Sequence, residues 1–109
     1  MLTVRSIGHV AIRVKDVGRT LAFYVGQLGF REMMRIDRDG RLWLLYLRIT
    51  DTQFIELFPG GEGDVAPGSE RTAINHFCIE CSDLQATAKS LRSAGVTLTV
   101  EPKMGLDNN

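Results

Sequence analysis

Two histidines and one glutamate are the residues of this chain whose types could carry metal chemistry. His9 and His76 are the only histidines, and Glu56 lies between them in the sequence. Imidazole nitrogens and carboxylate oxygens are common ligands of divalent metal ions, and donors from separate strands can converge on one ion. The ordinary alternative is that the histidines are solvated and that Glu56 is one polar position of an alternating strand.

Each of these residues lies in a stretch that we expect to form a β-strand. Side chains alternate between the two faces of a strand, so every second residue shares a face. The apolar residues on the face opposite the three candidates are Val10, Ile12, Val14, Ile55, Leu57, Phe77 and Ile79. If this apolar face packs on helices, His9, Glu56 and His76 all turn toward the other, concave side of the sheet.

The two histidines also occupy equivalent positions of an internal repeat. Residues 7–17, IGHVAIRVKDV, align with residues 74–84, INHFCIECSDL, at an offset of 67 residues that matches Ile, His, Ile and Asp. The repeat favours the metal interpretation, because two related modules would present their histidines symmetrically across a shared cleft. Both copies are therefore expected to begin with a strand that carries one ligand.

A helix is predicted after each of these strands. Apolar residues recur at helical spacing at Val17, Leu21, Tyr24 and Leu28 in the first copy, and at Leu84, Ala88, Leu91 and Ala94 in the second. Asp16 can cap the first helix; the second can be capped by Asp83, or by Ser82 with Gln85 completing a capping box. Gly29 and Gly95 suit the left-handed residue that ends a helix.

Three further strands are predicted in the first copy, at 30–36, 42–49 and 53–58. The Asp39-Gly40 pair between the first two is a strong hairpin signal. Residues 1–58 are thus expected to form one β-α-β-β-β module, within an α+β fold of paired modules.

The second module is expected to be incomplete in this sequence. Residues 59–73 hold four glycines and two prolines and are predicted to be a linker. The module then covers 74–109, with strands at 74–81 and 96–101 around its helix, and Asn109 aligns with Leu42 of the first copy. We expect the real protein to be longer; a second chain that supplies the missing cover, or a degenerate module, are the alternatives.

Composition excludes several classes of partner. The chain has 109 residues, 44% of them hydrophobic, and thirteen basic side chains balance thirteen acidic ones. The formal net charge is zero, so charge does not indicate binding to nucleic acid or an anionic membrane. The N-terminus lacks the apolar run of a signal peptide and no stretch approaches the length of a membrane span, so a cytoplasmic protein is expected. Cys78 and Cys81 would point to opposite faces of a strand, which favours ordinary buried thiols over a disulfide or a zinc site.

Three segments resemble the vicinal oxygen chelate superfamily, which includes glyoxalase I, bleomycin-resistance proteins and extradiol dioxygenases. They are residues 8–30, GHVAIRVKDVGRTLAFYVGQLGF, residues 53–58, QFIELF, and residues 75–84, NHFCIECSDL. The resemblance covers the whole chain and implies paired βαβββ modules. It also implies metal ligands at His9, Glu56 and His76, with a fourth, a glutamate near position 123, outside this sequence. The metal would be divalent, with Ni, Zn, Mn and Fe as candidates.

Within that superfamily, glyoxalase-like members match best, because extradiol dioxygenases do not require the carboxylate at Glu56. The resemblance implies a metal-dependent lyase or isomerase that handles a small substrate with vicinal oxygens through an enediolate-type intermediate. Glu56 is the candidate catalytic base, and Phe54 and Phe58 are candidate walls of the substrate pocket. Leu57-Phe58-Pro59-Gly60-Gly61 stands where glutathione-dependent enzymes carry a Thr-x-Asn type segment.

A non-catalytic protein that binds a small molecule, as bleomycin-resistance proteins do, is the alternative function. An extradiol dioxygenase is a weaker alternative. The family resemblance also implies a homodimer, since modules pair between chains as often as within one.

Overall fold

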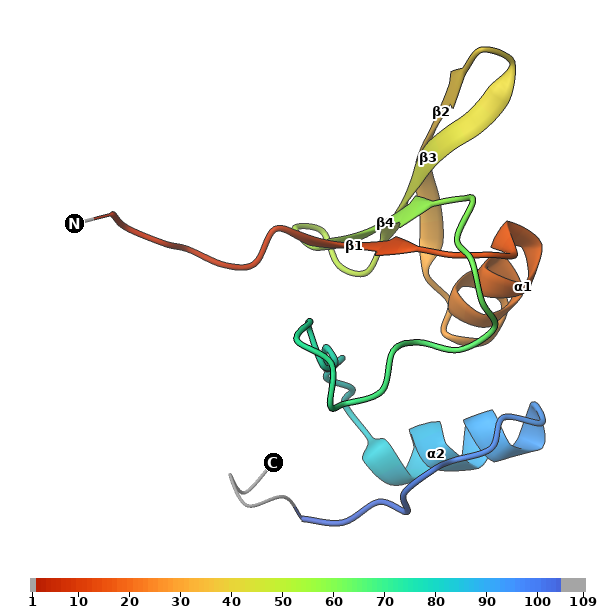
Figure 1. Cartoon of the computed structure of the whole chain (residues 1–109). Coiled ribbons are helices and arrows are strands. Elements are labelled where there is room, and N and C mark those ends of the chain that lie inside the picture. The colour runs from red at the N-terminus through yellow and green to blue at the C-terminus, as the bar shows by residue number, and fades with distance from the viewer. Residues whose placement is uncertain (1, 105–109) are drawn as a thin grey trace. The chain divides into compact units, whose positions relative to one another are not determined.

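The structure is a computed structural model that describes residues 2–104 (Figure 1). The chain divides into two compact units between Ala66 and Pro67, called unit 1 and unit 2 below. Unit 1 contains the elements β1 (His9–Arg13), α1 (Val17–Leu21), η1 (Ala22–Gln27), β2 (Arg31–Arg38), β3 (Arg41–Arg48) and β4 (Phe54–Phe58), and unit 2 contains α2 (Leu84–Ser93). No helix within residues 2–104 has both the length and the apolar character that crossing a membrane requires.

Unit 1 is a four-stranded mixed sheet with the order β1-β4-β3-β2. β1 pairs with β4 in parallel, whereas β3 pairs with β4 and with β2 in antiparallel fashion. The order of elements confirms the predicted β-α-β-β-β module. This topology places β4, which carries Glu56, between β1, which carries His9, and β3.

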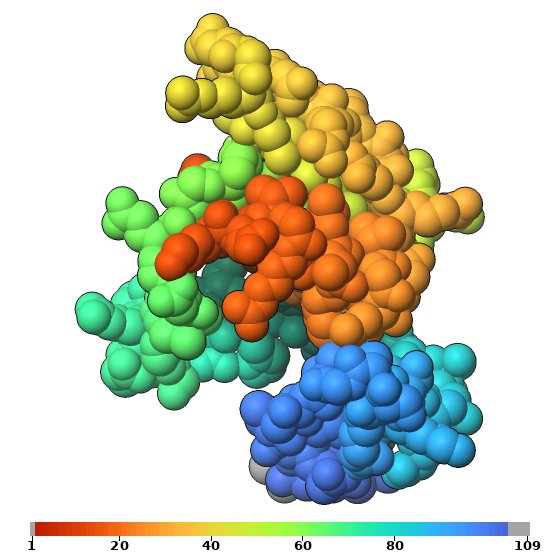
Figure 2. Space-filling model, turned by 90° about the vertical axis from the view of Figure 1, so that its right-hand side faces the viewer, coloured from red at the N-terminus to blue at the C-terminus, as the bar shows by residue number. Residues whose placement is uncertain are grey.

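The hairpin between β2 and β3 turns at the predicted Asp39-Gly40 pair. Asp39 has a φ of 52° and Gly40 a φ of 75°. Two successive residues with positive φ are what a type I′ turn requires, and Asp-Gly meets that requirement at low cost. The outer part of this hairpin, drawn in yellow, projects from the rest of unit 1 (Figure 2).

The first helical segment begins as predicted and then widens. The side chain of Asp16 accepts a hydrogen bond from the backbone N–H of Arg19 at 3.0 Å, which caps α1. From Ala22 the helix continues as the π-helix η1, and the N–H of Leu28 donates to the carbonyl of Phe23 at 3.0 Å. Gly29, with a φ of 76°, follows this last turn. The expected single α-helix is therefore α1 followed by η1.

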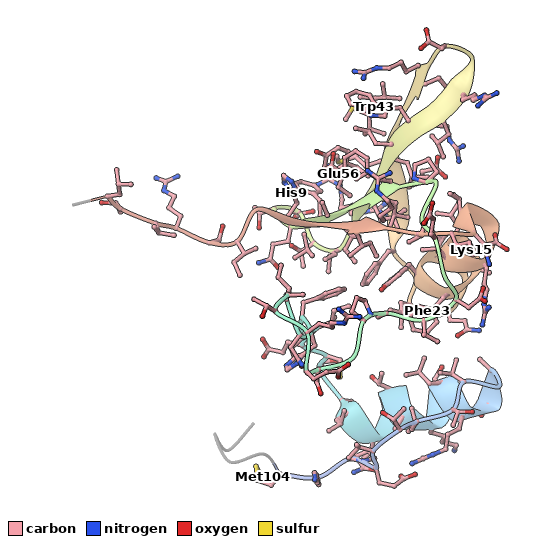
Figure 3. The ribbon with its side chains drawn as sticks, in the orientation of Figure 1. His9, Lys15, Phe23, Trp43, Glu56 and Met104 are labelled. Atoms are coloured by element: carbon pink, nitrogen blue, oxygen red, sulfur yellow. The ribbon has the colours of Figure 1, made fainter. Side chains whose placement is uncertain are left out.

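Four aliphatic residues with no exposed surface form the core of unit 1. They are Leu45, Leu47, Ile55 and Leu57. Leu45 lies opposite Leu57 and Leu47 opposite Ile55 across the β3–β4 pair, so all four share one face of the sheet. Burial of each such side chain contributes about 1.5–3 kcal/mol. Phe23 of η1 lies on the side of the sheet away from Glu56, which is the face that these residues share (Figure 3).

Unit 2 forms its predicted helix but not its predicted strands. Asp83, rather than Ser82, caps α2 by accepting from the N–H of Ala86 at 2.9 Å, and Gly95 has a φ of 84°. The strand predictions for 74–81 and 96–101 are wrong, because neither segment adopts strand structure. A strand satisfies its backbone N–H and C=O groups only through a neighbour, and residues 67–104 contain no strand to serve as one.

The exposure of the two cysteines follows from this local structure. Cys78 and Cys81 are both free thiols, so the expectation of no disulfide is confirmed. They are exposed rather than buried, however, because the segment that carries them is not part of a sheet.

Candidate functional site

The structure brings His9 and Glu56 together on the face of the sheet away from the helix. β1 and β4 run in parallel with His9 opposite Phe54 and Ala11 opposite Glu56, so the two side chains lie on one face of adjacent strands. The Nε2 atom of His9 is 3.2 Å from the Oε2 atom of Glu56 (Figure 3). The Glu56 side chain is 11% exposed and that of His9 is 48% exposed. Glu56 is thus a carboxylate held at the centre of the sheet beside a half-exposed imidazole.

Tyr46 of β3 completes this arrangement, although the sequence analysis did not single it out. It lies directly opposite Glu56 in the β3–β4 register. Its ring stands edge-on to the imidazole of His9, with 5.8 Å between the ring centroids. Burial, followed by the negative charge of the nearby Glu56 carboxylate, raises the pKa of the Tyr46 phenol. The signal in the sequence was weak: Tyr46 has the parity opposite to the buried residues Leu45 and Leu47, but apolar residues occur at both parities of this strand.

Aromatic and cationic side chains flank Glu56 along β4. Phe54 and Phe58 lie two residues to either side of it and share its face. The guanidinium of Arg48 lies over the ring of Phe54 at 5.2 Å, and that of Arg13 lies over Phe58 at 5.3 Å. Such cation–π pairs are attractive because the ring face is negative. A central carboxylate between two aromatic–guanidinium pairs is therefore the chemical pattern of this face.

His76 belongs to unit 2, in a segment without regular secondary structure. It is exposed, and its Nδ1 atom lies 2.6 Å from Oδ1 of Asn75. In the part of the chain that the structure describes, no group of three or more His, Cys, Asp or Glu side chains gathers as a metal site. Of the predicted ligands, the structure therefore assembles His9 and Glu56.

The donor pair fits a divalent transition metal as two of its ligands. One imidazole nitrogen and one carboxylate oxygen suit Zn, Ni, Mn or Fe, and both come from strands whose positions the core defines. A catalytic site of this kind normally takes three protein ligands and leaves positions open for substrate. The pair in unit 1 could supply two of these three ligands.

Comparison of the sequence with known families gives the class of this protein. The sequence model of the Glyoxalase/Bleomycin resistance protein/Dioxygenase superfamily matches residues 6–109. The chain belongs to this superfamily.

Two curated relatives of this chain differ widely in length. The chain is 26% identical to Glyoxalase I of Saccharomyces cerevisiae, over 83% of the chain and 35% of the yeast protein. It is 29% identical to the Escherichia coli protein YaeR, over 94% of the chain and 83% of that relative. The chain therefore spans about a third of the yeast enzyme but most of the bacterial relative.

Solved structures show the same fold. A glyoxalase family protein from Enterococcus faecalis superposes with a TM-score of 0.71 at 24% identity, covering 84% of this chain and 73% of that one. Lactoylglutathione lyase from Agrobacterium tumefaciens gives a TM-score of 0.65 at 17% identity, covering 94% and 79%. Both confirm the predicted α+β fold class.

Proposed function

We propose that this chain is a glyoxalase-like, metal-dependent lyase or isomerase domain that acts on a small substrate with vicinal oxygens. The observation that carries the proposal is the His9–Glu56 pair, with 3.2 Å between imidazole nitrogen and carboxylate oxygen on the face of the sheet away from the helix. A carboxylate that is largely removed from water is costly unless it has a partner, and the partner here is an imidazole, itself a common metal ligand. Membership of the superfamily supports the same function.

His9 and Glu56 would hold the metal ion from unit 1, and we propose His76 as the ligand that the second module contributes. When bound, a divalent ion supplies a Lewis acid that polarises the substrate's neighbouring oxygens. The role of the protein is to hold these donors at the geometry that leaves substrate positions open.

Glu56 is the proposed general base. A carboxylate that is largely removed from water and lies at the middle of a sheet face can take a proton from the carbon next to a substrate carbonyl. Phe54 and Phe58, on either side of it, would exclude water and contact the apolar part of the substrate. The names of two similar proteins, Glyoxalase I and lactoylglutathione lyase, fit this proton transfer. Because the chain departs from the glutathione-holding segment after Glu56, we propose a substrate other than a glutathione adduct.

Metal titration of purified variants tests the ligand set. We expect the unchanged protein, prepared free of metal, to bind Ni²⁺ or Zn²⁺ stoichiometrically in calorimetry, and His9→Ala, Glu56→Gln and His76→Ala each to lower the affinity by at least about tenfold. Glu32→Gln is the matched control, because Glu32 pairs with Arg35 on β2. Unchanged affinity in His9→Ala and Glu56→Gln would refute the proposal, whereas loss in those two alone would remove His76 from the set.

A non-catalytic small-molecule binder is the second candidate, and the flanking aromatic–guanidinium pairs favour it. Arg48 over Phe54 and Arg13 over Phe58 are surfaces on which planar ligands stack. Turnover separates the two candidates: a metal-loaded protein that binds 2-oxo aldehydes or related small substrates with vicinal oxygens without converting them supports the binder. An extradiol dioxygenase remains the weaker possibility, and oxygen consumption with catechols tests it.

We further propose that the protein functions as a homodimer in the cytoplasm. The resemblance implies that modules pair between chains as often as within one, and pairing between chains would supply a partner sheet for unit 1. Sedimentation equilibrium of the purified protein and fractionation of expressing cells are the measurements that check these two points.

A further inference from the structure

We propose that Tyr46 is a positioning residue that orients His9 and Glu56 at the same time. Its hydroxyl would orient the carboxylate that lies opposite it in the strand register, and its ring packs nearly perpendicular to the imidazole. The assignment to metal chemistry rests on the proposed function, but the positioning itself concerns contacts within unit 1.

The position of Tyr46 follows from the strand register. Tyr46 lies directly opposite Glu56 across the β3–β4 pair, and its backbone neighbours Leu45 and Leu47 have no exposed surface. Directly opposed residues of antiparallel strands have their side chains within contact distance. Two fully buried neighbours leave the backbone at Tyr46 little freedom, so the phenol is presented to Glu56 by the core itself.

The ring of Tyr46 is held between two other rings. The imidazole of His9 lies at 5.8 Å with an interplanar angle of 80°, and the ring of Phe54 lies at 6.5 Å with an angle of 82°. Edge-to-face packing at such distances is favourable and directional. His9 is half-exposed, so the ring contact with Tyr46 adds to the restraint that Glu56 supplies at 3.2 Å.

A carboxylate has two oxygens and can accept from two sides. Glu56 directs Oε2 toward the imidazole of His9, and Tyr46, directly opposite Glu56 on the neighbouring strand, carries a hydroxyl, a group that donates to carboxylates. Partners that hydrogen-bond a metal ligand set its orientation, and their loss typically lowers metal affinity 10–100-fold. Tyr46 is not itself a proposed ligand or a catalytic residue.

Two substitutions separate the functions of ring and hydroxyl. Tyr46→Phe keeps the ring against His9 and removes the hydroxyl at Glu56, whereas Tyr46→Leu removes both. Tyr24→Phe is the matched control, because it deletes a phenol hydroxyl elsewhere in unit 1. The Tyr24 ring belongs to η1 and packs with Phe23 and Phe30.

The first measurement needs no metal. NMR relaxation of the His9 ring in the metal-free protein should show an ordered imidazole in the unchanged protein, in Tyr46→Phe and in Tyr24→Phe, and a mobile one in Tyr46→Leu. Equal order in Tyr46→Leu would overturn the inference, whatever the protein binds.

The second measurement is the affinity for Zn²⁺ by calorimetry. We expect about a tenfold loss in Tyr46→Phe, a larger loss in Tyr46→Leu and none in Tyr24→Phe. If Tyr46→Phe only lowers thermal stability and keeps the affinity, Tyr46 is structural and the inference is wrong. If the unchanged protein binds no metal but His9 loses order in Tyr46→Leu, the proposed function fails while the positioning of the pair stands.

Discussion

Units 1 and 2 begin with the same sequence pattern and reach different structures. In unit 1 the pattern around His9 becomes β1, which pairs with β4, and the capped helix α1 follows it. In unit 2 the equivalent pattern around His76 has no strand structure, although the equivalent helix α2 forms with an equivalent Asp83 cap. The cap is the same because its hydrogen bond is local, and the strand differs because its hydrogen bonds are not.

The same difference reaches the candidate ligands. His9 gains Glu56 and Tyr46 as neighbours because β4 lies beside β1 and β3 lies beside β4. His76 has Asn75 as its hydrogen-bonding neighbour, one residue away in the sequence. The sheet therefore brings residues that are distant in the sequence close to His9.

Hydrogen exchange should show the largest difference between the two units. Amides of β4 are covered by β1 and β3, so they should exchange only through global unfolding, which costs about 5–15 kcal/mol in a typical domain. Amides of residues 74–81 should exchange at nearly the unprotected rate. Strong protection of 74–81 would show that this segment pairs with a strand and would contradict the difference between the two units.

Truncation of leucines should show the next largest difference. Leu57→Ala removes a fully buried side chain from the core of unit 1 and should cost about 2–5 kcal/mol of the free energy of unfolding. Leu84→Ala, at a leucine of α2 that is 52% exposed, should cost less than about 0.5 kcal/mol. Urea denaturation followed by circular dichroism compares the two. Equal costs would mean that α2 is packed as tightly as the sheet.

The two helix caps test how much each helix depends on local interactions. Asp16→Ala and Asp83→Ala each remove a side-chain acceptor at 3.0 and 2.9 Å and should cost about 1 kcal/mol locally. The loss of amide protection should be greater in α2, because most residues of α2 are exposed, whereas α1 continues into η1 and the two together have several half-buried residues. Hydrogen exchange resolved by residue measures both helices. Equal losses would indicate that the half-buried residues of α1 add nothing to the stability of that helix.

The smallest expected effect is a loss of stability at alkaline pH that is specific to unit 1. Burial raises the pKa of Tyr24 above its usual value of 10.0. The folded state then holds this proton more tightly than the unfolded state, so the contribution to stability is complete below about pH 10 and falls as the pH rises further. Urea midpoints reported by Trp43 fluorescence should fall less steeply with pH in Tyr24→Phe. An identical slope in both proteins would exclude Tyr24 as the cause.

Most of the first module could be predicted from the sequence. Alternating residues indicated its strands, Asp39-Gly40 the hairpin, and Asp16 the helix start. The parity that puts His9 and Glu56 on one face also followed from the pattern. These features depend on periodicity and on hydrogen bonds between residues close in sequence, which a single sequence records.

Only the tertiary structure decided which strands are neighbours. The parallel pairing of β1 with β4 puts His9 within 3.2 Å of Glu56, and the β3–β4 register puts Tyr46 opposite Glu56. Apolar residues occupy both faces of β3, so the sequence pattern alone did not distinguish Tyr46 as a site residue. For His76 the sequence predicted a strand that residues 67–104 do not form, because strand structure depends on a partner that local sequence does not specify.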